Sequence, residues 1–178
     1  MSALESPRLT IPVGPDDHIR GPAAAPLTLV EYGDYECPYC GEAYPIVKEV
    51  ERALGDQLTS VFRNFPLDQI HPHAFEAALA AESAAAQGRF WEMHDRLFEN
   101  QRQLRSTDLL SHAEALGLDV ERFATELERH AFEERVRSDF LSGVRSGVNG
   151  TPTFFINGRR HNGPYDLKTL LSSLRAAL

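Results

Sequence analysis

The sequence predicts an α/β domain that is interrupted by a long helical insertion. Two strand patterns separated by one helical pattern lie near the N-terminus, and a strand, turn, strand and helix pattern ends the chain. The segment between these two halves is almost wholly helical in its periodicity. The chain has 178 residues, 42% of them hydrophobic, which suits one domain with a sizeable core.

These observations divide the chain into three parts. We expect an N-terminal extended arm over residues 1–26, an α/β core over residues 27–70 and 148–178, and an inserted α-helical subdomain over residues 71–147.

Prolines, glycines and apolar segments predict the N-terminal helix and strands. Five prolines interrupt the arm, and residues 9–11 are expected to form a short edge strand that ends at Pro12. Residues 27–32 predict a buried strand and residues 58–65 a second one. Between them, Pro38 lies just inside a helix that ends at Gly55, because proline at the first helical position loses no hydrogen bond.

The insertion is expected to contain five helices. Glycines or a good N-cap, Asp119, mark most of their ends. The expected segments are residues 74–87, 89–101, 107–116, 120–130 and 132–146.

The C-terminal part predicts a hairpin and a helix. Residues 153–156 form a strand, Asn157-Gly158 is a hairpin turn signal, and residues 160–162 return. Asp166 caps a final helix.

Charge and hydropathy exclude two classes of partner. The formal net charge is −8 without a basic stripe, which is unfavourable for nucleic-acid binding. No stretch approaches the ~20 apolar residues that a membrane-spanning helix needs. The N-terminal segment lacks the apolar core of a secretory signal, so we expect a cytoplasmic protein, with an exported form whose signal has been removed as the alternative.

The two cysteines are the strongest functional signal. Cys37 and Cys40 are the only cysteines, and they lie where a strand gives way to a helix. A disulfide between them closes a very short loop and stabilises little, which favours a chemical role. A zinc site needs about four ligands. His71 and His73 are the candidates to complete one, but their spacing does not match, so we expect no metal; an inert buried thiol pair is the remaining alternative.

Position assigns different roles to the two sulfurs. Cys37 lies at a helix N-terminus, which favours its thiolate and makes it the attacking group. Cys40 lies one turn later and resolves the mixed disulfide. Asp34 and Glu36 oppose the helix by placing negative charge nearby, and Tyr39 is neutral. We therefore expect a moderately lowered Cys37 pKa and an intermediate reduction potential.

Four segments resemble the DsbA-like branch of the thioredoxin superfamily, which interrupts the thioredoxin-like fold with a helical insertion. The Cys37-Pro38-Tyr39-Cys40 motif together with Thr151-Pro152-Thr153 more than a hundred residues later carries most of this resemblance. Pro38-Tyr39 also looks like glutaredoxin, but glutaredoxins are shorter and lack the helical block. The segments are residues 29–41, 62–67, 88–91 and 147–158.

The resemblance implies further site residues. Pro152 is expected to be cis and to face Cys37, which leaves the backbone of Thr151 free to pair with an extended substrate. Glu31 is expected to be a buried acid that relays protons to Cys40, since a desolvated carboxylate with a raised pKa is a suitable base.

The predicted function is thiol–disulfide exchange. The substrates are protein, peptide or small-molecule disulfides or dithiols, and glutathione or a thioredoxin-type partner recycles the protein. No cofactor is expected, because the dithiol is the redox carrier. Two alternatives remain: a glutathione-dependent transferase or isomerase, a class that generally replaces the CxxC, and a non-catalytic binding or chaperone module.

Other chemistry-bearing side chains have simpler interpretations. The aromatic residues of the insertion are expected to be core, Arg63 to pair with an acid, His18 to be structural, and three further histidines to be caps or surface residues. The aromatics are Phe90, Trp91 and Phe98, and the three histidines are His71, His73 and His94.

Overall fold

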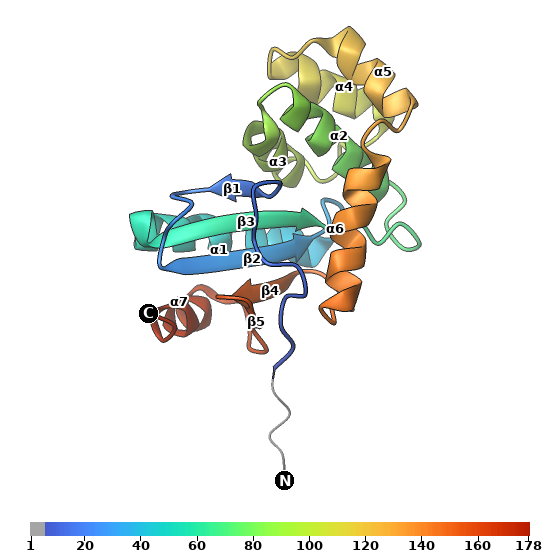
Figure 1. The fold of residues 1–178 in the computed structure, drawn as a ribbon. Coiled ribbons are helices and arrows are strands. Elements are labelled where there is room, and N and C mark those ends of the chain that lie inside the picture. Colours follow the sequence, from blue (N-terminus) through green and yellow to red (C-terminus); the bar gives the residue numbers. More distant parts are fainter. Residues whose placement is uncertain (1–5) are drawn as a thin grey trace.

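The computed structural model describes residues 6–178 and contains a five-stranded mixed sheet (Figure 1). The strand order is β1-β3-β2-β4-β5. β2 and β3 are parallel in a register that pairs Leu27 with Leu58, and the other neighbours are antiparallel. The strands are β1 (His18–Arg20), β2 (Leu27–Gly33), β3 (Leu58–Asn64), β4 (Thr153–Ile156) and β5 (Arg159–Arg160).

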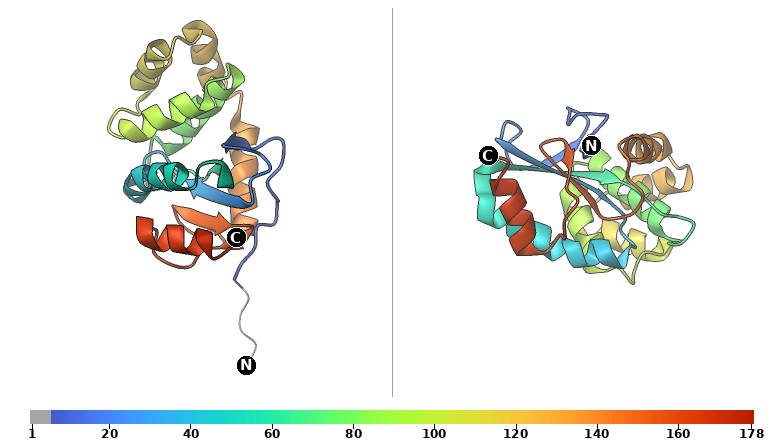
Figure 2. Two further views of the ribbon diagram at one scale, coloured as in Figure 1. Left: turned by 90° about the vertical axis from the view of Figure 1, so that its left-hand side faces the viewer. Right: turned by 90° about the horizontal axis from the view of Figure 1, so that it is seen from below.

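Alternate residues of the central strand β2 face two different apolar layers. Leu27 and Leu29 pack against helices α1 (Pro38–Leu54) and α7 (Leu167–Arg175). Val30 and Tyr32 face the opposite layer, which contains the N-terminal arm and helix α6 (Glu133–Arg145). Figure 2 shows α1 and α7 on one side of the sheet and α6 on the other. A short 3-10 turn, Gly55–Gln57, joins α1 to β3.

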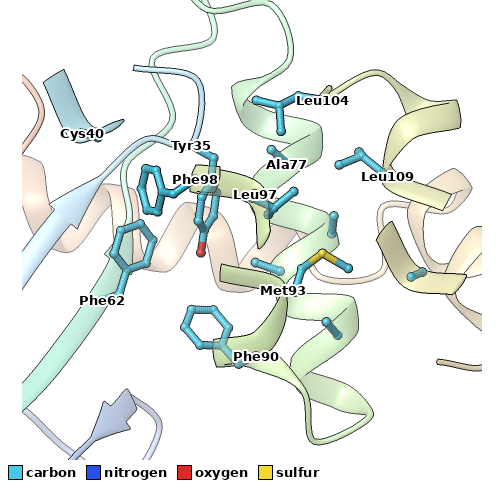
Figure 3. Packing of buried hydrophobic residues seen from close by; sticks show 14 of the residues in the cluster. Tyr35, Cys40, Phe62, Ala77, Phe90, Met93, Leu97, Phe98, Leu104 and Leu109 are labelled. Carbon is cyan, nitrogen blue, oxygen red and sulfur yellow. The ribbon is translucent and has the colours of Figure 1, made fainter. Parts of the chain in front are cut away.

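The helical block lies at one edge of the sheet and packs onto it through aromatic side chains. Besides α6 it contains α2 (Ala74–Ala86), α3 (Phe90–Glu99), α4 (Ser106–Ala115) and α5 (Val120–Glu128). Figure 3 shows the shared core, in which Phe62 of β3 and Tyr35 face Phe90, Met93 and Phe98 of α3. Trp91 and Phe98 also pack there, as expected of core aromatics.

The predicted fold class is confirmed: the order is strand, helix, strand, then a helical block, then two strands and a helix. Asn157 and Gly158 have φ angles of 46° and 79°, as a two-residue hairpin turn requires. The exact borders of the arm, core and insertion stay a prediction.

Two local predictions were wrong. Residues 9–11 form no strand; near them there is only an isolated bridge between Arg8 and Arg159. The edge strand is β1 instead, because the backbone carbonyls of Ile11 and Pro12 accept hydrogen bonds from Arg63 at 2.9 and 3.2 Å rather than from a neighbouring strand. The return strand covers residues 159–160, not 160–162.

Within residues 6–178, none of the helices combines the length and the apolar character needed to cross a membrane.

Candidate active site

Cys37 is the N-cap of α1, and its position is set by the turn that follows β2. The Asp34 carboxylate accepts hydrogen bonds from the backbone N–H groups of Glu36 and Cys37, at 2.8 and 3.2 Å. Pro38 begins the helix and Cys40 lies in its first turn. Both cysteines are free thiols, and both are buried: Cys37 is 3% exposed and Cys40 is fully covered. Tyr39, between them, is 62% exposed.

The two acids near Cys37 are engaged by the loop that follows β3. The second Asp34 oxygen accepts hydrogen bonds from Leu67 N at 2.9 Å and from His71 Nδ1 at 2.8 Å. Glu36 contacts the backbone N–H and the ring of His73. The expectation that these carboxylates simply oppose the thiolate therefore needs correction, because donors from the protein surround both of them.

The electrostatic settings of the two sulfurs are opposite. A hydrogen bond from Cys40 lowers the pKa of Cys37 to about 5 against the effect of burial, helped by the Thr151 side chain and the backbone N–H groups of Cys40 and Tyr39. Burial raises the pKa of Cys40 well above its usual value, and its hydrogen bond to Cys37 raises it further. The geometry thus pairs a Cys37 thiolate with a Cys40 thiol.

Thr151 and Pro152 lie against Cys37. Their peptide bond is cis. The Cys37 thiol is 3.5 Å from the Thr151 carbonyl oxygen, to which it donates. The Thr151 hydroxyl is buried and makes no hydrogen bond within the described residues. It is therefore available to the Cys37 thiolate.

Glu31 lies on β2, 7% exposed, on the side of the sheet that α1 covers. Burial raises its pKa to about 8, and the charges of Glu51 and Cys37 add to the effect. Its Oε1 atom has no hydrogen-bond partner. The charge of Glu31 also contributes to the raised pKa of Cys40. An uncharged Glu31 at neutral pH is the form that this environment favours.

A small cavity of about 20 Å³ adjoins Glu31, and it is large enough for one water molecule. Lys48 and Glu51 of α1 also line it. Arg20 joins its outer wall by hydrogen bonds to Glu51 at 3.2 Å and to Asp95 at 2.8 Å. The carboxyl group of Glu31 therefore borders a small cavity that both apolar and charged side chains line.

The prediction that His94 is a cap or surface residue was wrong. This residue is buried in the aromatic core, not at a cap or on the surface, and its ring contacts the Tyr35 hydroxyl at 3.1 Å. Burial lowers its pKa to about 3, so the ring is neutral. The expected acid partner of Arg63 is Asp17, at 2.8 Å, and His18 contacts Glu82 at 2.9 Å.

One residue beside the site was missed from the sequence. Gln101, in the loop between α3 and α4, donates hydrogen bonds from Nε2 to the carbonyl oxygens of Tyr35 and Cys37, at 3.0 and 2.9 Å. A single glutamine in a polar loop carries no recognisable pattern. Its proximity to Cys37 depends on how the helical block packs on the core.

The fold and this site define a class: a thioredoxin-fold protein with a dithiol at the start of a helix, facing a cis-proline. The model of the family described as Thioredoxin matches residues 14–176. The chain therefore belongs to the thioredoxin family.

Several solved structures share this fold. BdbD of Bacillus subtilis superposes with a TM-score of 0.85 at 23% identity, over 97% of each chain. A thioredoxin-like oxidoreductase of Silicibacter pomeroyi gives 0.82 at 26% identity, over 92% of this chain and 93% of that one. The α-DsbA1 protein of Wolbachia pipientis gives 0.77 at 21% identity, over 95% and 94%.

The curated relatives are named as Na(+)/H(+) antiporters rather than as thioredoxin-like proteins. A Na(+)/H(+) antiporter NhaA 3 of Salinispora tropica is 50% identical over 95% of this chain, and an NhaA 1 of a Mycobacterium species is 49% identical over 94%. The chain spans only 26% and 28% of those proteins. They contain a region similar to this chain within a much longer sequence.

Proposed function

We propose that this protein is a thiol–disulfide oxidoreductase that exchanges its Cys37–Cys40 dithiol with protein or peptide disulfides. The observation that carries the proposal is the opposite setting of the two sulfurs, with the pKa of Cys37 lowered to about 5 and that of Cys40 raised. An inert buried thiol pair has no need of this asymmetry, because burial alone raises the pKa of both thiols.

The reaction in the reducing direction has two exchange steps. The Cys37 thiolate attacks one sulfur of the substrate disulfide, forms a mixed disulfide and releases the other sulfur as a thiolate. Cys40 then loses its proton and attacks Cys37 Sγ, which releases the second substrate sulfur and leaves the Cys37–Cys40 disulfide. Two electrons pass from the protein dithiol to the substrate. The oxidising direction is the reverse of these steps.

Glu31, in its ionised form, is proposed to accept the proton that Cys40 loses. The charge of Cys37 contributes to the raised pKa of Glu31, so the ionised fraction of Glu31 should grow once Cys37 is bound in the mixed disulfide. A carboxyl group with a pKa of about 8 is partly ionised near neutral pH. The charge of Glu31 also contributes to the raised pKa of Cys40, which supports a position of the two groups near each other. In this role Glu31 moves a proton and makes no contact with the substrate sulfur.

The substrate is proposed to lie along the loop of Thr151 and Pro152. Among the described residues, the Thr151 carbonyl has no hydrogen-bond donor except the Cys37 thiol. Once the thiol is ionised this carbonyl is free to accept from the backbone of an extended polypeptide.

Glutathione or a thioredoxin-type donor is the proposed recycling partner, in a cytoplasmic location. Both supply electrons by the same thiol chemistry that Cys37 and Cys40 use. The intact CxxC speaks against the alternative of a glutathione-dependent transferase or isomerase, which generally replaces it.

Replacement of each cysteine by serine tests the proposal. Cys37→Ser removes the attacking sulfur, so we expect loss of activity in an insulin-reduction or scrambled-ribonuclease assay. Cys40→Ser retains the attacking sulfur but not the resolving one, so it is the matched control and should accumulate a mixed disulfide with its substrate. Full activity of Cys37→Ser, or no activity of the unaltered protein, would refute the proposal and favour a non-catalytic binding module.

A further inference from the structure

The helical block reaches the backbone of the active-site turn through one side chain. Gln101 Nε2 donates to the carbonyl oxygens of Tyr35 and Cys37, at 3.0 and 2.9 Å. An amide nitrogen has two hydrogens, so both are used. Within residues 6–178, no other side chain of α3, α4 or their connecting loop hydrogen-bonds to the backbone of residues 35–40.

The side-chain amide of Gln101 also restricts the residue that α1 can carry at position 41. A Cβ atom on Gly41, in the first turn of α1, would lie 2.1 Å from Gln101 Oε1 and 2.7 Å from its Cδ. Gly41 lacks a positive φ, so its backbone suits any residue. The glycine is therefore explained by the space that Gln101 occupies rather than by backbone conformation.

We propose that Gln101 is a positioning residue for Cys37, which fixes the turn before α1 by bonding its Tyr35 and Cys37 carbonyls. This inference rests on the proposed function, since it assigns Gln101 to the reactivity of the attacking sulfur. Gln101 does not touch the sulfur or the substrate.

The effect on Cys37 passes through the backbone of the turn. The hydrogen bond from the Cys40 side chain lowers the pKa of Cys37 most, and the backbone N–H groups of Cys40 and Tyr39 lower it further. These effects depend on the shape of the turn that places the groups near the sulfur. The Cys37 carbonyl also accepts the first helical hydrogen bond, from Gly41 N at 3.0 Å. Without Gln101 the carbonyls of residues 35 and 37 lose their shared donor, and the turn is held by fewer bonds. The thiolate should then be less stable.

Gln101→Met tests this inference, because methionine keeps the length of the side chain and removes both donors. We expect the Cys37 pKa, read from the ultraviolet absorbance of the thiolate in reduced protein, to rise by roughly half a unit to one unit. The rate of Cys37 alkylation by iodoacetamide well below this pKa should fall about three- to tenfold. Gln103→Met in the same loop is the control, since Gln103 is exposed and its side chain makes no hydrogen bond.

A second pair of variants keeps the test decisive if Gln101→Met folds poorly. Gly41→Ala should displace the Gln101 amide and reproduce the rise in the Cys37 pKa. In a Gln101→Ala background the added methyl group finds space, so Gly41→Ala should change the pKa no further. An unchanged Cys37 pKa in Gln101→Met or Gly41→Ala would overturn the inference. Thiolate titration and alkylation need no substrate, so this result is independent of whether the proposed exchange activity holds.

Discussion

At the scale of single residues, the environments of Cys37, Cys40 and Glu31 differ in the charge state that each favours. The helix start and the Cys40 thiol favour a charged Cys37, whereas burial favours an uncharged Cys40 and an uncharged Glu31. The proposed proton transfer from Cys40 to Glu31 would connect two groups whose pKa values are both raised. We therefore expect Cys40 to attack only after the mixed disulfide has formed on Cys37.

Glu31→Gln should stabilise the protein in a pH-dependent way. The pKa of Glu31 is about 8 in the folded protein, above its usual 4.5, so its contribution to stability is fully present below pH 4.5 and is lost as the pH rises through 8. Glutamine mimics the uncharged acid and avoids this loss. We expect a gain in the free energy of unfolding of roughly 1–3 kcal/mol near pH 7 that grows between about pH 4.5 and 8.

The same variant should slow the resolving step. A mass spectrum of acid-quenched reaction mixtures should show more mixed disulfide on Cys37 than the unaltered protein gives. The control is Glu49→Gln, on the exposed part of α1 with 49% of its side chain accessible. A Glu31→Gln variant with unchanged stability across this pH range and no accumulation of mixed disulfide would contradict both the burial argument and the relay.

The sequence identified some of these residues because their patterns are local or belong to the family. Cys37, Cys40 and Pro152 lie in short motifs, and Glu31 follows from its place on the strand before them. His94 and Gln101 could not be placed in this way. Whether a histidine on a helix faces water or the core, and whether a loop glutamine reaches Cys37, depends on the packing of α3 against the sheet.

At the scale of elements, the N-terminal arm is held by one buried arginine of β3. Arg63 is 2% exposed and forms two hydrogen bonds to the Asp17 carboxylate, at 2.8 and 2.9 Å. It also donates to the Tyr32 hydroxyl and to two carbonyl groups of the arm. These contacts join the arm to the face of the sheet opposite α1.

Asp17→Asn should destabilise the protein markedly, because it leaves a buried guanidinium without its counter-charge. Removing one partner of a buried ion pair costs about 3–5 kcal/mol. Chemical denaturation at neutral pH measures this loss against Asp16→Asn, whose side chain is exposed and makes no hydrogen bond. Equal stabilities of the two variants would show that the arm contributes little to the folded state.

Most elements could be predicted because their signals lie within them. The helices end at glycines such as Gly117 and Gly147, and the Asn157-Gly158 turn fixes the hairpin. The edge strand was misplaced because residues 9–11 contain two apolar side chains, whereas residues 18–20 contain only one, Ile19. The partner that decides between them, Arg63, lies more than forty residues later.

At the scale of the whole molecule, the dithiol lies where the α/β core meets the helical block. The turn before α1 receives hydrogen bonds from Gln101 of the block, and the loop after β3 donates to Asp34 in the same turn. Thr151 approaches Cys37 from the C-terminal half of the core. The reactive sulfur is thus surrounded by segments from three distant parts of the chain.

The measurement that tests the central claim most directly is equilibration of the protein in glutathione buffers of graded potential, with free thiols alkylated and counted by mass. The account predicts one two-electron transition in which both cysteines become protected together, as the Cys37–Cys40 disulfide, at a potential between those of strong reductants and strong oxidants. A protein that stays fully reduced in every buffer, or that gains only a glutathione adduct on one cysteine, would contradict it.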